Sequence, residues 1–215
     1  MKYEHIFFDL DGTLTDPALG ITNAIIYGRK KWGLDPGENK DYYKFIGPPM
    51  PRSYEEYWGF SHEDAVRFLD TYREYFGTIG LFENEVYPGI PELLAALKDA
   101  GCKLYVATTK PTGFSEQIAE HFDFAKYFDI VSGSDPLADN TKADVIRHAR
   151  DACAVDMTSA IMVGDRLFDV EGAHECGIPC VGVAYGYGGR AELEAAGAEW
   201  VVDSVEELSA LLLSL

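Results

Sequence analysis

The sequence has few cysteines, few positive charges and no long apolar run, and each shortage excludes a class of protein. Its four cysteines include no Cys-x-x-Cys pair, which argues against a zinc site or a redox motif and favours reduced, mostly buried thiols. The 18 Lys and Arg residues face 36 Asp and Glu residues, which gives a formal charge of −18. Because binding to a nucleic acid polymer needs clustered positive charge, we expect no such partner.

No stretch approaches the ~20 apolar residues that cross a membrane, and the N-terminus lacks the pattern of a signal peptide. We therefore expect a cytoplasmic protein with no membrane partner, present as a monomer or a weak homodimer.

The length and the apolar content of the chain are sufficient for a hydrophobic core. Its 215 residues, 47% of them apolar, suffice for one core or for one core and a small insert.

A short apolar run near the N-terminus leads into two carboxylates. His5 to Phe8 predicts a buried strand that stops where Gly12 permits a turn, so that Asp9 and Asp11 lie at the carboxyl end of the strand. Ligands of open α/β sheets bind at this end of the strands. An alternative remains open, in which Asp9 is a strand cap and Asp11 a turn former.

Further apolar runs predict four more buried parallel strands, at residues 103–109, 128–133, 160–165 and 179–184. Helical spacing of apolar residues fills the intervals between most of them. Strands that alternate with helices indicate an α/β protein with a Rossmann-like, doubly wound parallel sheet.

Residues 17–86 break this alternation and predict a small α-helical domain inserted into an α/β core of residues 1–16 and 87–215. Helical patterns occur at about 18–32 and 62–77. The insert holds 14 of the 28 aromatic residues. Two interpretations stay open: these rings fill the core of the insert, or some form an exposed apolar wall over an active site.

Several polar side chains follow the other predicted strands. They are Thr108 and Thr109 after the second strand, Lys142 after the third, and Asp165 and Asp169 after the fourth. Each alone has an ordinary structural explanation, as a cap, a surface lysine or a turn. Because the carboxyl ends of parallel strands share one edge, we expect Asp9, Asp11, Thr108, Lys142 and Asp165 to converge there.

Three carboxylates packed together repel one another, and a hard divalent cation relieves this repulsion. An all-oxygen site that leaves room for water and phosphate favours a magnesium ion, Mg²⁺. Lys142 and the Thr108 hydroxyl are suited to hold the remaining phosphate oxygens.

Four motifs carry a resemblance to a known family. They are Asp9-Leu-Asp11-Gly-Thr-Leu, Val-Ala-Thr108-Thr-Lys-Pro, Lys142 in Asn-Thr-Lys-Ala-Asp, and Gly-Asp165-Arg-Leu-Phe-Asp169. In order and spacing the chain resembles the haloacid dehalogenase (HAD) superfamily, in the helical-cap phosphatase branch that includes phosphoglycolate phosphatase-like and 5′-nucleotidase-like proteins. The resemblance implies a phosphatase that hydrolyses a small phosphate monoester.

The resemblance also implies a role for each carboxylate. Asp9 is the expected nucleophile, which forms an aspartyl-phosphate, and Asp11 the expected acid and base. Mg²⁺ would be held by Asp9, by the carbonyl of Asp11 and by Asp165, with Asp169 in support.

Phosphate binding would fall to Thr108, Thr109 and Lys142. The second motif departs slightly from close relatives, in which Asn or Ser often replaces Thr109, so we expect the backbone N–H of Thr109 to matter more than its side chain. The next residue, Lys110, is a weaker candidate for the site, and we favour its interpretation as a surface lysine.

The insert corresponds to the cap that selects the leaving group, with expected hinges near residues 16–17 and 86–88. Its segment 45–52 resembles a cap loop, which Gly-Pro-Pro would stiffen. Arg52 is either an exposed arginine or a contact for a second anionic group, as in a glycolate ester. A nucleoside ester would instead use the aromatic residues.

Two rival functions stay open beside the phosphatase. A phosphomutase of the β-phosphoglucomutase type would use the same aspartyl-phosphate. A catalytically silent relative that binds a phosphorylated ligand is disfavoured, because Asp9, Asp11 and Lys142 are all present.

Overall fold

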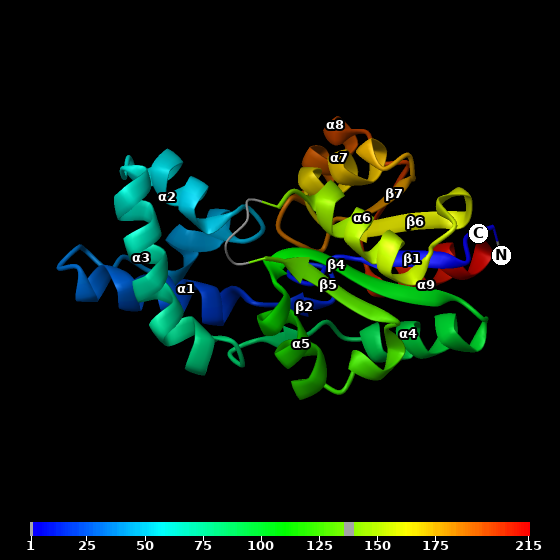
Figure 1. The fold of residues 1–215 in the computed structure, drawn as a ribbon, viewed down its shortest axis with the longest axis horizontal. Coiled ribbons are helices and arrows are strands. Elements are labelled where there is room, and N and C mark those ends of the chain that lie inside the picture. Colours follow the sequence, from blue (N-terminus) through cyan, green and yellow to red (C-terminus); the bar gives the residue numbers. More distant parts are fainter. Residues whose placement is uncertain (1, 136–139) are drawn as a thin grey trace. The chain divides into compact units, whose positions relative to one another are not determined.

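The structure, a computed structural model, describes residues 2–135 and 140–215 and divides into two compact units (Figure 1). The core unit comprises residues 1–15 and 86–215, and the insert unit comprises residues 16–85. These boundaries differ by one residue from those expected from the sequence. In the described ranges, no helix is long and apolar enough to span a membrane.

The core unit is built on a six-stranded sheet with the order β5-β4-β1-β6-β7-β8, in which all neighbouring strands are parallel. The strands are β1 (His5–Phe8), β4 (Lys103–Pro111), β5 (Ile130–Ser134), β6 (Ala160–Gly164), β7 (Cys180–Val183) and β8 (Trp200–Val202). The sequence pattern predicted the first five of them and missed β8. That strand is only three residues long, lies at the edge and is half-buried over two of its residues, so it has no long apolar run.

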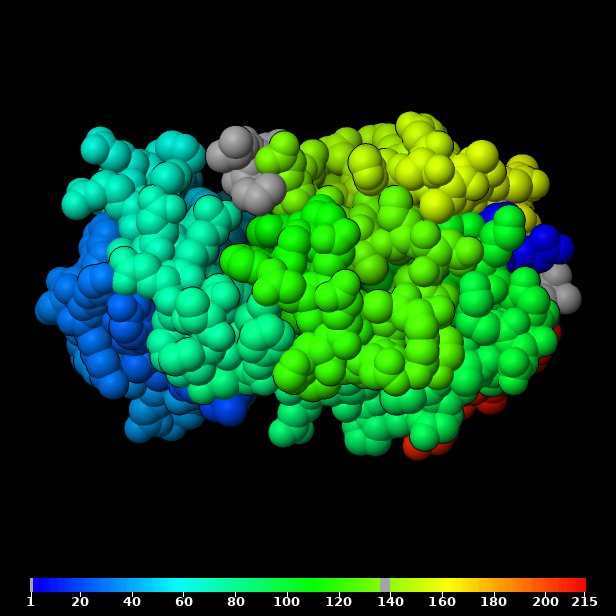
Figure 2. Space-filling model, turned by 60° about the horizontal axis from the view of Figure 1, so that its bottom comes forward, coloured from blue at the N-terminus to red at the C-terminus, as the bar shows by residue number. Residues whose placement is uncertain are grey.

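Helices cover both faces of this sheet. They are α4 (Ile90–Asp99), α5 (Thr112–His121), α6 (Lys142–Cys153), α7 (Leu167–Glu175), α8 (Gly189–Ala196) and α9 (Val205–Ser214). On one face, Phe7, Tyr105 and Met162 lie side by side in register and pack with buried residues of α6, α7 and α8. Figure 1 shows these three helices on one side of the strands and α4 and α5 on the other. In Figure 2 the green surface of α4 and α5 covers much of that second face.

The insert unit is helical, as the sequence predicted. It contains α1 (Ala18–Lys31), the 3₁₀ helix η1 (Asn39–Phe45), α2 (Met50–Trp58), α3 (His62–Tyr75) and the π-helix η2 (Phe76–Gly80). A short pair of strands, β2 (Thr15–Asp16) and β3 (Glu85–Val86), lies where the chain passes between the units.

The prediction of a loop at residues 45–52 was partly wrong. Helix α2 begins at Met50, so Arg52 lies in its first turn and is exposed. The Gly-Pro-Pro sequence misled this prediction because Pro51 is also well suited to the first turn of a helix, where no backbone N–H is needed for the helical hydrogen bonds.

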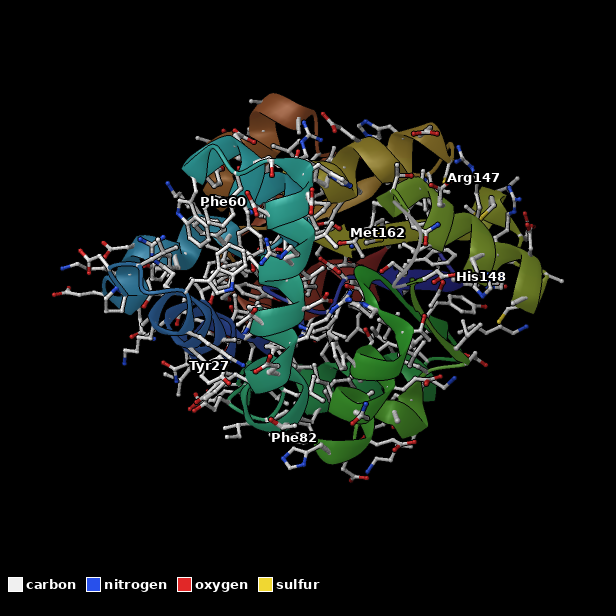
Figure 3. The ribbon with its side chains drawn as sticks, turned by 60° about the vertical axis from the view of Figure 1, so that its left-hand side comes forward. Tyr27, Phe60, Phe82, Arg147, His148 and Met162 are labelled. Carbon is white, nitrogen blue, oxygen red and sulfur yellow. The ribbon has the colours of Figure 1, made fainter. Side chains whose placement is uncertain are left out.

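Most aromatic residues of the insert fill its core. Tyr54 stacks on Trp58 with ring centroids 5.0 Å apart, and Phe45 and Phe68 pack against Tyr54. Phe60, labelled in Figure 3, packs against Trp58 and Phe68, with ring centroids 5.5 and 5.8 Å apart. The interpretation of the rings as a core is therefore right for this cluster. It does not account for Tyr43 and Phe82, which are exposed, whereas the partly exposed Tyr57 packs its ring against Phe45.

The buried hydroxyl of Tyr54 gives a test of this core. Among the described residues this hydroxyl has no hydrogen-bond partner, whereas the hydroxyl of Tyr42 donates to the carbonyl oxygen of Pro36 at 2.6 Å. A buried unsatisfied polar group costs about 1–3 kcal/mol. We therefore expect Tyr54→Phe to raise the free energy of unfolding by about 1 kcal/mol and Tyr42→Phe to lower it by a similar amount. Urea denaturation measures both, and equal losses in the two variants would contradict this account.

Candidate active site

The sheet order brings the predicted site residues together. Strand β1 lies between β4 and β6. Asp9 and Asp165 directly follow β1 and β6, and Thr108 lies in the second half of β4, so all three belong to the carboxyl-terminal edge of the sheet. Lys142 is the first residue of α6, which follows β5. All four side chains are buried. Of the residues expected to converge, Asp9, Asp165 and Lys142 lie close together in the core unit.

Lys142 connects two of the carboxylates. Its Nζ lies 2.7 Å from Oδ1 of Asp9 and 2.8 Å from Oδ1 of Asp169, and it donates to the carbonyl oxygen of Ala107 at 3.0 Å. Burial alone lowers the pKa of an ammonium group, but Asp169 and Asp9 outweigh burial and raise the pKa of Lys142 above its usual value. Lys142 therefore stays protonated at neutral pH.

The side chain of Lys142 is fixed by the start of its helix. Thr141 caps α6 by accepting a hydrogen bond from the backbone N–H of Asp144, and the Asp144 carboxylate accepts one from the N–H of Thr141. This capping box stabilises the first turn and so determines where the Lys142 side chain begins.

Asp9, Asp165 and Asp169 form a cluster in which one oxygen of each lies within 4.8 Å of the others. Burial, together with Asp169 and Asp9, raises the pKa of Asp165 well above its usual range. Burial also raises the pKa of Asp169, to about 6, although Lys142 opposes this shift. Among the described carboxylates, Lys142 forms ion pairs with Asp9 and Asp169, so its single positive charge faces a cluster of three carboxyl groups.

The donors suit a hard cation. Oδ1 of Asp165 is buried and has no hydrogen-bond partner among the described residues, while Oδ2 accepts from the backbone N–H of Tyr187 at 2.7 Å. Carboxylate oxygens in this number and proximity fit Mg²⁺ in chemistry and charge. Asp169, expected from the sequence only to support such a site, lies in the cluster itself.

Two glycines make room for the Asp165 carboxylate. A Cβ atom at Gly12 would lie 2.2 Å from Oδ2 of Asp165, and one at Gly186 would lie 2.4 Å from its Cβ. Gly12 also has a φ of +84°, which other residues rarely adopt. The sequence prediction used Gly12 only as a turn former and missed Gly186 and Tyr187. The glycine-rich run 186–189, which begins three residues after the end of β7, was the available signal.

Lys110 is not a surface lysine, contrary to the sequence interpretation. Its side chain is only 7% exposed and its Nζ forms an ion pair with Oδ2 of Asp11. The register of β4 against β5 shifts between Ala107 and Pro111, and this irregularity lies in the segment that carries Lys110. Burial raises the pKa of Asp11, and Lys110 acts in the opposite direction.

The remaining predicted residues lie in different places. Thr108 is 3% exposed, and its Oγ1 accepts from the backbone N–H of Lys110 at 3.3 Å. Thr109 is half-buried, and its carbonyl oxygen accepts from the hydroxyl of Ser134 at 2.7 Å. Arg52 belongs to the insert unit, so its contact with an anion stays a prediction.

Removing one carboxylate should relieve the repulsion in the cluster. A carboxyl group whose pKa is raised by folding stabilises the folded state at low pH, and this contribution is lost as the pH rises through the raised pKa. With EDTA present, we expect Asp165→Asn to melt above the wild type at pH 8, by roughly 3–5 °C for each pKa unit of the shift. The gap should shrink towards pH 5.

Calorimetry with added Mg²⁺ supplies the control for this experiment. Mg²⁺ should raise the melting temperature of the wild type at pH 8 and leave that of Asp165→Asn nearly unchanged. Identical melting temperatures in EDTA, or an equal response to Mg²⁺, would show that Asp165 is not part of a strained cation site.

Comparisons with known proteins identify the family of this chain. The family described as haloacid dehalogenase-like hydrolase matches residues 6–183. A 5′-nucleotidase from Pseudomonas aeruginosa is 42% identical over 196 residues, which cover 91% of this chain and 89% of that protein. A phosphoglycolate phosphatase from Caulobacter vibrioides is 33% identical over 213 residues, which cover 93% and 86% of the two chains.

A solved structure extends the likeness to three dimensions. The crystal structure of "a predicted phosphatase" from Clostridium acetobutylicum superimposes with a TM-score of 0.95 at 47% identity, over 99% of each chain. The family match covers most of the core unit, including β1, β4 and β6 with the residues that follow them. The chain therefore belongs to the haloacid dehalogenase-like hydrolase family and is a phosphatase.

Proposed function

We propose that this phosphatase depends on Mg²⁺ and hydrolyses a small phosphate monoester through an aspartyl-phosphate on Asp9. One observation carries the proposal, the buried cluster in which Asp9 lies against Lys142 and within 4.8 Å of Asp165 and Asp169. A nucleophile, a fixed positive charge and the donors for a cation then lie at one point. Mg²⁺ bound there would reduce the negative charge on the phosphoryl group and so ease the approach of a carboxylate.

In the first half-reaction a carboxylate oxygen of Asp9 attacks phosphorus, and the bond from phosphorus to the ester oxygen breaks. Lys142 orients the Asp9 carboxylate through the 2.7 Å contact with Oδ1. The departing alkoxide takes a proton from Asp11 and leaves as an alcohol. In the second half-reaction Asp11 accepts a proton from water, which attacks phosphorus and releases Asp9 and inorganic phosphate.

The surroundings of Asp11 support its role as an acid. Burial raises the pKa of Asp11 and so favours the protonated form that an acid needs. Lys110 acts to lower the pKa of Asp11, and its ion pair with Oδ2 also fixes the direction of the carboxyl group. Oδ1 of Asp11 is buried and has no hydrogen-bond partner among the described residues, which leaves it able to face a substrate oxygen.

The relatives named above support two substrate classes, phosphoglycolate-like esters and nucleoside monophosphates. We propose that the insert unit acts as a cap that selects between leaving groups, with β2 and β3 as its connections to the core unit.

The presence of Asp9, Asp11 and Lys142, each in an ion pair, supports an active enzyme over a catalytically silent relative.

The nucleophile is tested with p-nitrophenyl phosphate, an ester that makes little demand on the cap. We expect activity that requires Mg²⁺ and is abolished by EDTA, and we expect Asp9→Asn to lose turnover completely because the amide is a poor nucleophile. Circular dichroism checks that the variant is folded. Turnover by folded Asp9→Asn would refute the assignment, and transfer of phosphate between sugar hydroxyls without release would favour the mutase.

The acid is tested by a burst experiment on Asp11→Asn. p-Nitrophenolate leaves without a proton, so the first half-reaction should survive and release one equivalent of p-nitrophenol per site, followed by turnover slowed about 10²–10⁴-fold. An alkyl phosphate, whose alcohol needs a proton, should give no burst. Stopped-flow absorbance and rapid quench measure the two cases. If both esters lost their burst equally, Asp11 would have another role.

A further inference from the structure

The segment that leads from β7 into helix α8 contacts both loops that carry the carboxylates of the cluster. One loop follows β1 and begins with Asp9, and the other follows β6 and begins with Asp165. Residues 185–192 belong to neither loop and to none of the four sequence motifs. Figure 1 shows α8 beside α7, the helix that begins shortly after Asp165. The proposed chemistry uses no side chain of this segment.

Tyr185 fixes the backbone of the loop after β1. Its hydroxyl donates a hydrogen bond to the carbonyl oxygen of Thr13 at 2.9 Å, two residues beyond Asp11. The ring of Tyr185 packs edge-on against that of Tyr87, with centroids 5.0 Å apart, so the hydroxyl has a defined direction. The next carbonyl oxygen, that of Leu14, accepts from the backbone N–H of Tyr87 at 3.1 Å. Two adjacent carbonyl groups of the loop are therefore held by this tyrosine pair.

Two glycines bring the same segment against the loop after β6. A Cβ atom at Gly186 would lie 2.4 Å from the carbonyl oxygen of Gly12, and one at Gly188 would lie 2.4 Å from that of Asp165. Between these glycines, the backbone N–H of Tyr187 donates to Oδ2 of Asp165. Three consecutive residues thus contact both loops, at distances that only glycine permits.

Glu192 of α8 fixes the loop after β6 at the point where α7 begins. Its Oε1 accepts from the backbone N–H of Leu167 at 2.9 Å and from Nε of Arg166 at 2.8 Å. The backbone N–H of Arg166 in turn donates to Oδ2 of Asp169 at 3.0 Å, while Oδ1 of Asp169 faces Lys142. The orientation of a cluster carboxylate therefore depends on Glu192. Because Glu192 is paired with Arg166, it adds no net charge beside the cluster.

The two loops need such support because the carboxylates that they carry repel one another. This repulsion acts to separate the loop after β1 from the loop after β6. Mg²⁺ requires its oxygen ligands at near-ideal octahedral positions about 2.0–2.1 Å away, whereas Ca²⁺ accepts more variable positions at about 2.3–2.6 Å. A site that suits Mg²⁺ therefore depends more strongly on how exactly the loops are held than a site that suits Ca²⁺.

We propose that residues 185–192 form a clamp that holds the two loops at the spacing that Mg²⁺ requires, with Tyr185 and Glu192 as positioning residues. The inference rests on the proposed function, since it concerns the cation of that same phosphatase. The clamp then determines the preference of the site for Mg²⁺ over Ca²⁺. Removal of contacts that orient metal ligands typically lowers metal affinity about 10–100-fold.

Calorimetry on the metal-free full chain tests the clamp without catalysis. We expect Tyr185→Phe, which keeps the ring and loses the hydroxyl, to raise the dissociation constant for Mg²⁺ about tenfold and that for Ca²⁺ no more than about twofold. Glu192→Ala should act in the same way. Glu192→Gln keeps an oxygen that accepts from the N–H of Leu167, so it should lie between Glu192→Ala and the wild type, and it supplies the measurement if Glu192→Ala is unfolded.

Two variants of the core unit serve as matched controls. Tyr105→Phe removes a buried hydroxyl that lies 2.8 Å from Nδ1 of His5, near the start of β1. Glu194→Ala removes an exposed ion pair with Arg190 on α8 itself. Both should leave the ratio of the two dissociation constants within about twofold of the wild type, even where they lower the melting temperature. A change in this ratio therefore separates positioning from a general loss of stability.

An activity assay gives a second readout. With p-nitrophenyl phosphate, Tyr185→Phe and Glu192→Ala should need about tenfold more Mg²⁺ for half-maximal activity, and kcat at saturating Mg²⁺ should stay within about threefold of the wild type.

The outcomes separate the two proposals. A wild type that neither binds Mg²⁺ nor hydrolyses p-nitrophenyl phosphate with it refutes the proposed function, and the clamp with it. A wild type that does both, but whose Tyr185 and Glu192 variants keep the preference of the controls for Mg²⁺ over Ca²⁺, refutes the clamp alone. Equal weakening of both cations also overturns the clamp, because it indicates a general loss of structure.

Discussion

The contact of Lys142 with Asp9 and Asp169 is the interaction on which the candidate site depends. Buried carboxylates repel one another strongly, and a single ammonium group between two of them offsets part of that repulsion. In the described part of the chain, the third carboxylate, Asp165, accepts a hydrogen bond from a backbone N–H alone, and burial raises its pKa. The protein thus keeps a local excess of negative charge inside a chain that is already acidic, and a divalent cation is the simplest group that balances it.

Strand pairing, a helix cap and two glycines of the core unit hold these side chains in position. Parallel pairing of β1 with β4 and β6 places three strand ends side by side, and the capping box at Thr141 fixes the start of the helix that carries Lys142. Gly12 and Gly186 leave room for the Asp165 carboxylate, and any larger side chain at either position would collide with it. Burial and repulsion among the carboxylates therefore lower stability locally, at the place where the proposed chemistry needs negative charge.

The sequence predicted the parts of this site that follow from topology. Strand ends share an edge in any parallel sheet, so the convergence of Asp9, Thr108 and Asp165 could be predicted without coordinates. The role of Lys110 could not, because it depends on the shift of register within β4, which leaves no mark in the apolar pattern. Edge strand β8 was missed because three residues are too few to show an alternating pattern, and helix α2 was missed because Pro51 in its first turn also suits a loop.

The proposed phosphatase mechanism requires that Asp9 becomes phosphorylated. Borohydride reduces an acyl phosphate to an alcohol, so quenching the working enzyme with it should convert the phosphorylated aspartate to homoserine. Peptide mass spectrometry should then find homoserine at position 9, only when both Mg²⁺ and a phosphate ester are present. Homoserine at another aspartate, or none at all in an enzyme that is turning over its substrate, would contradict the account.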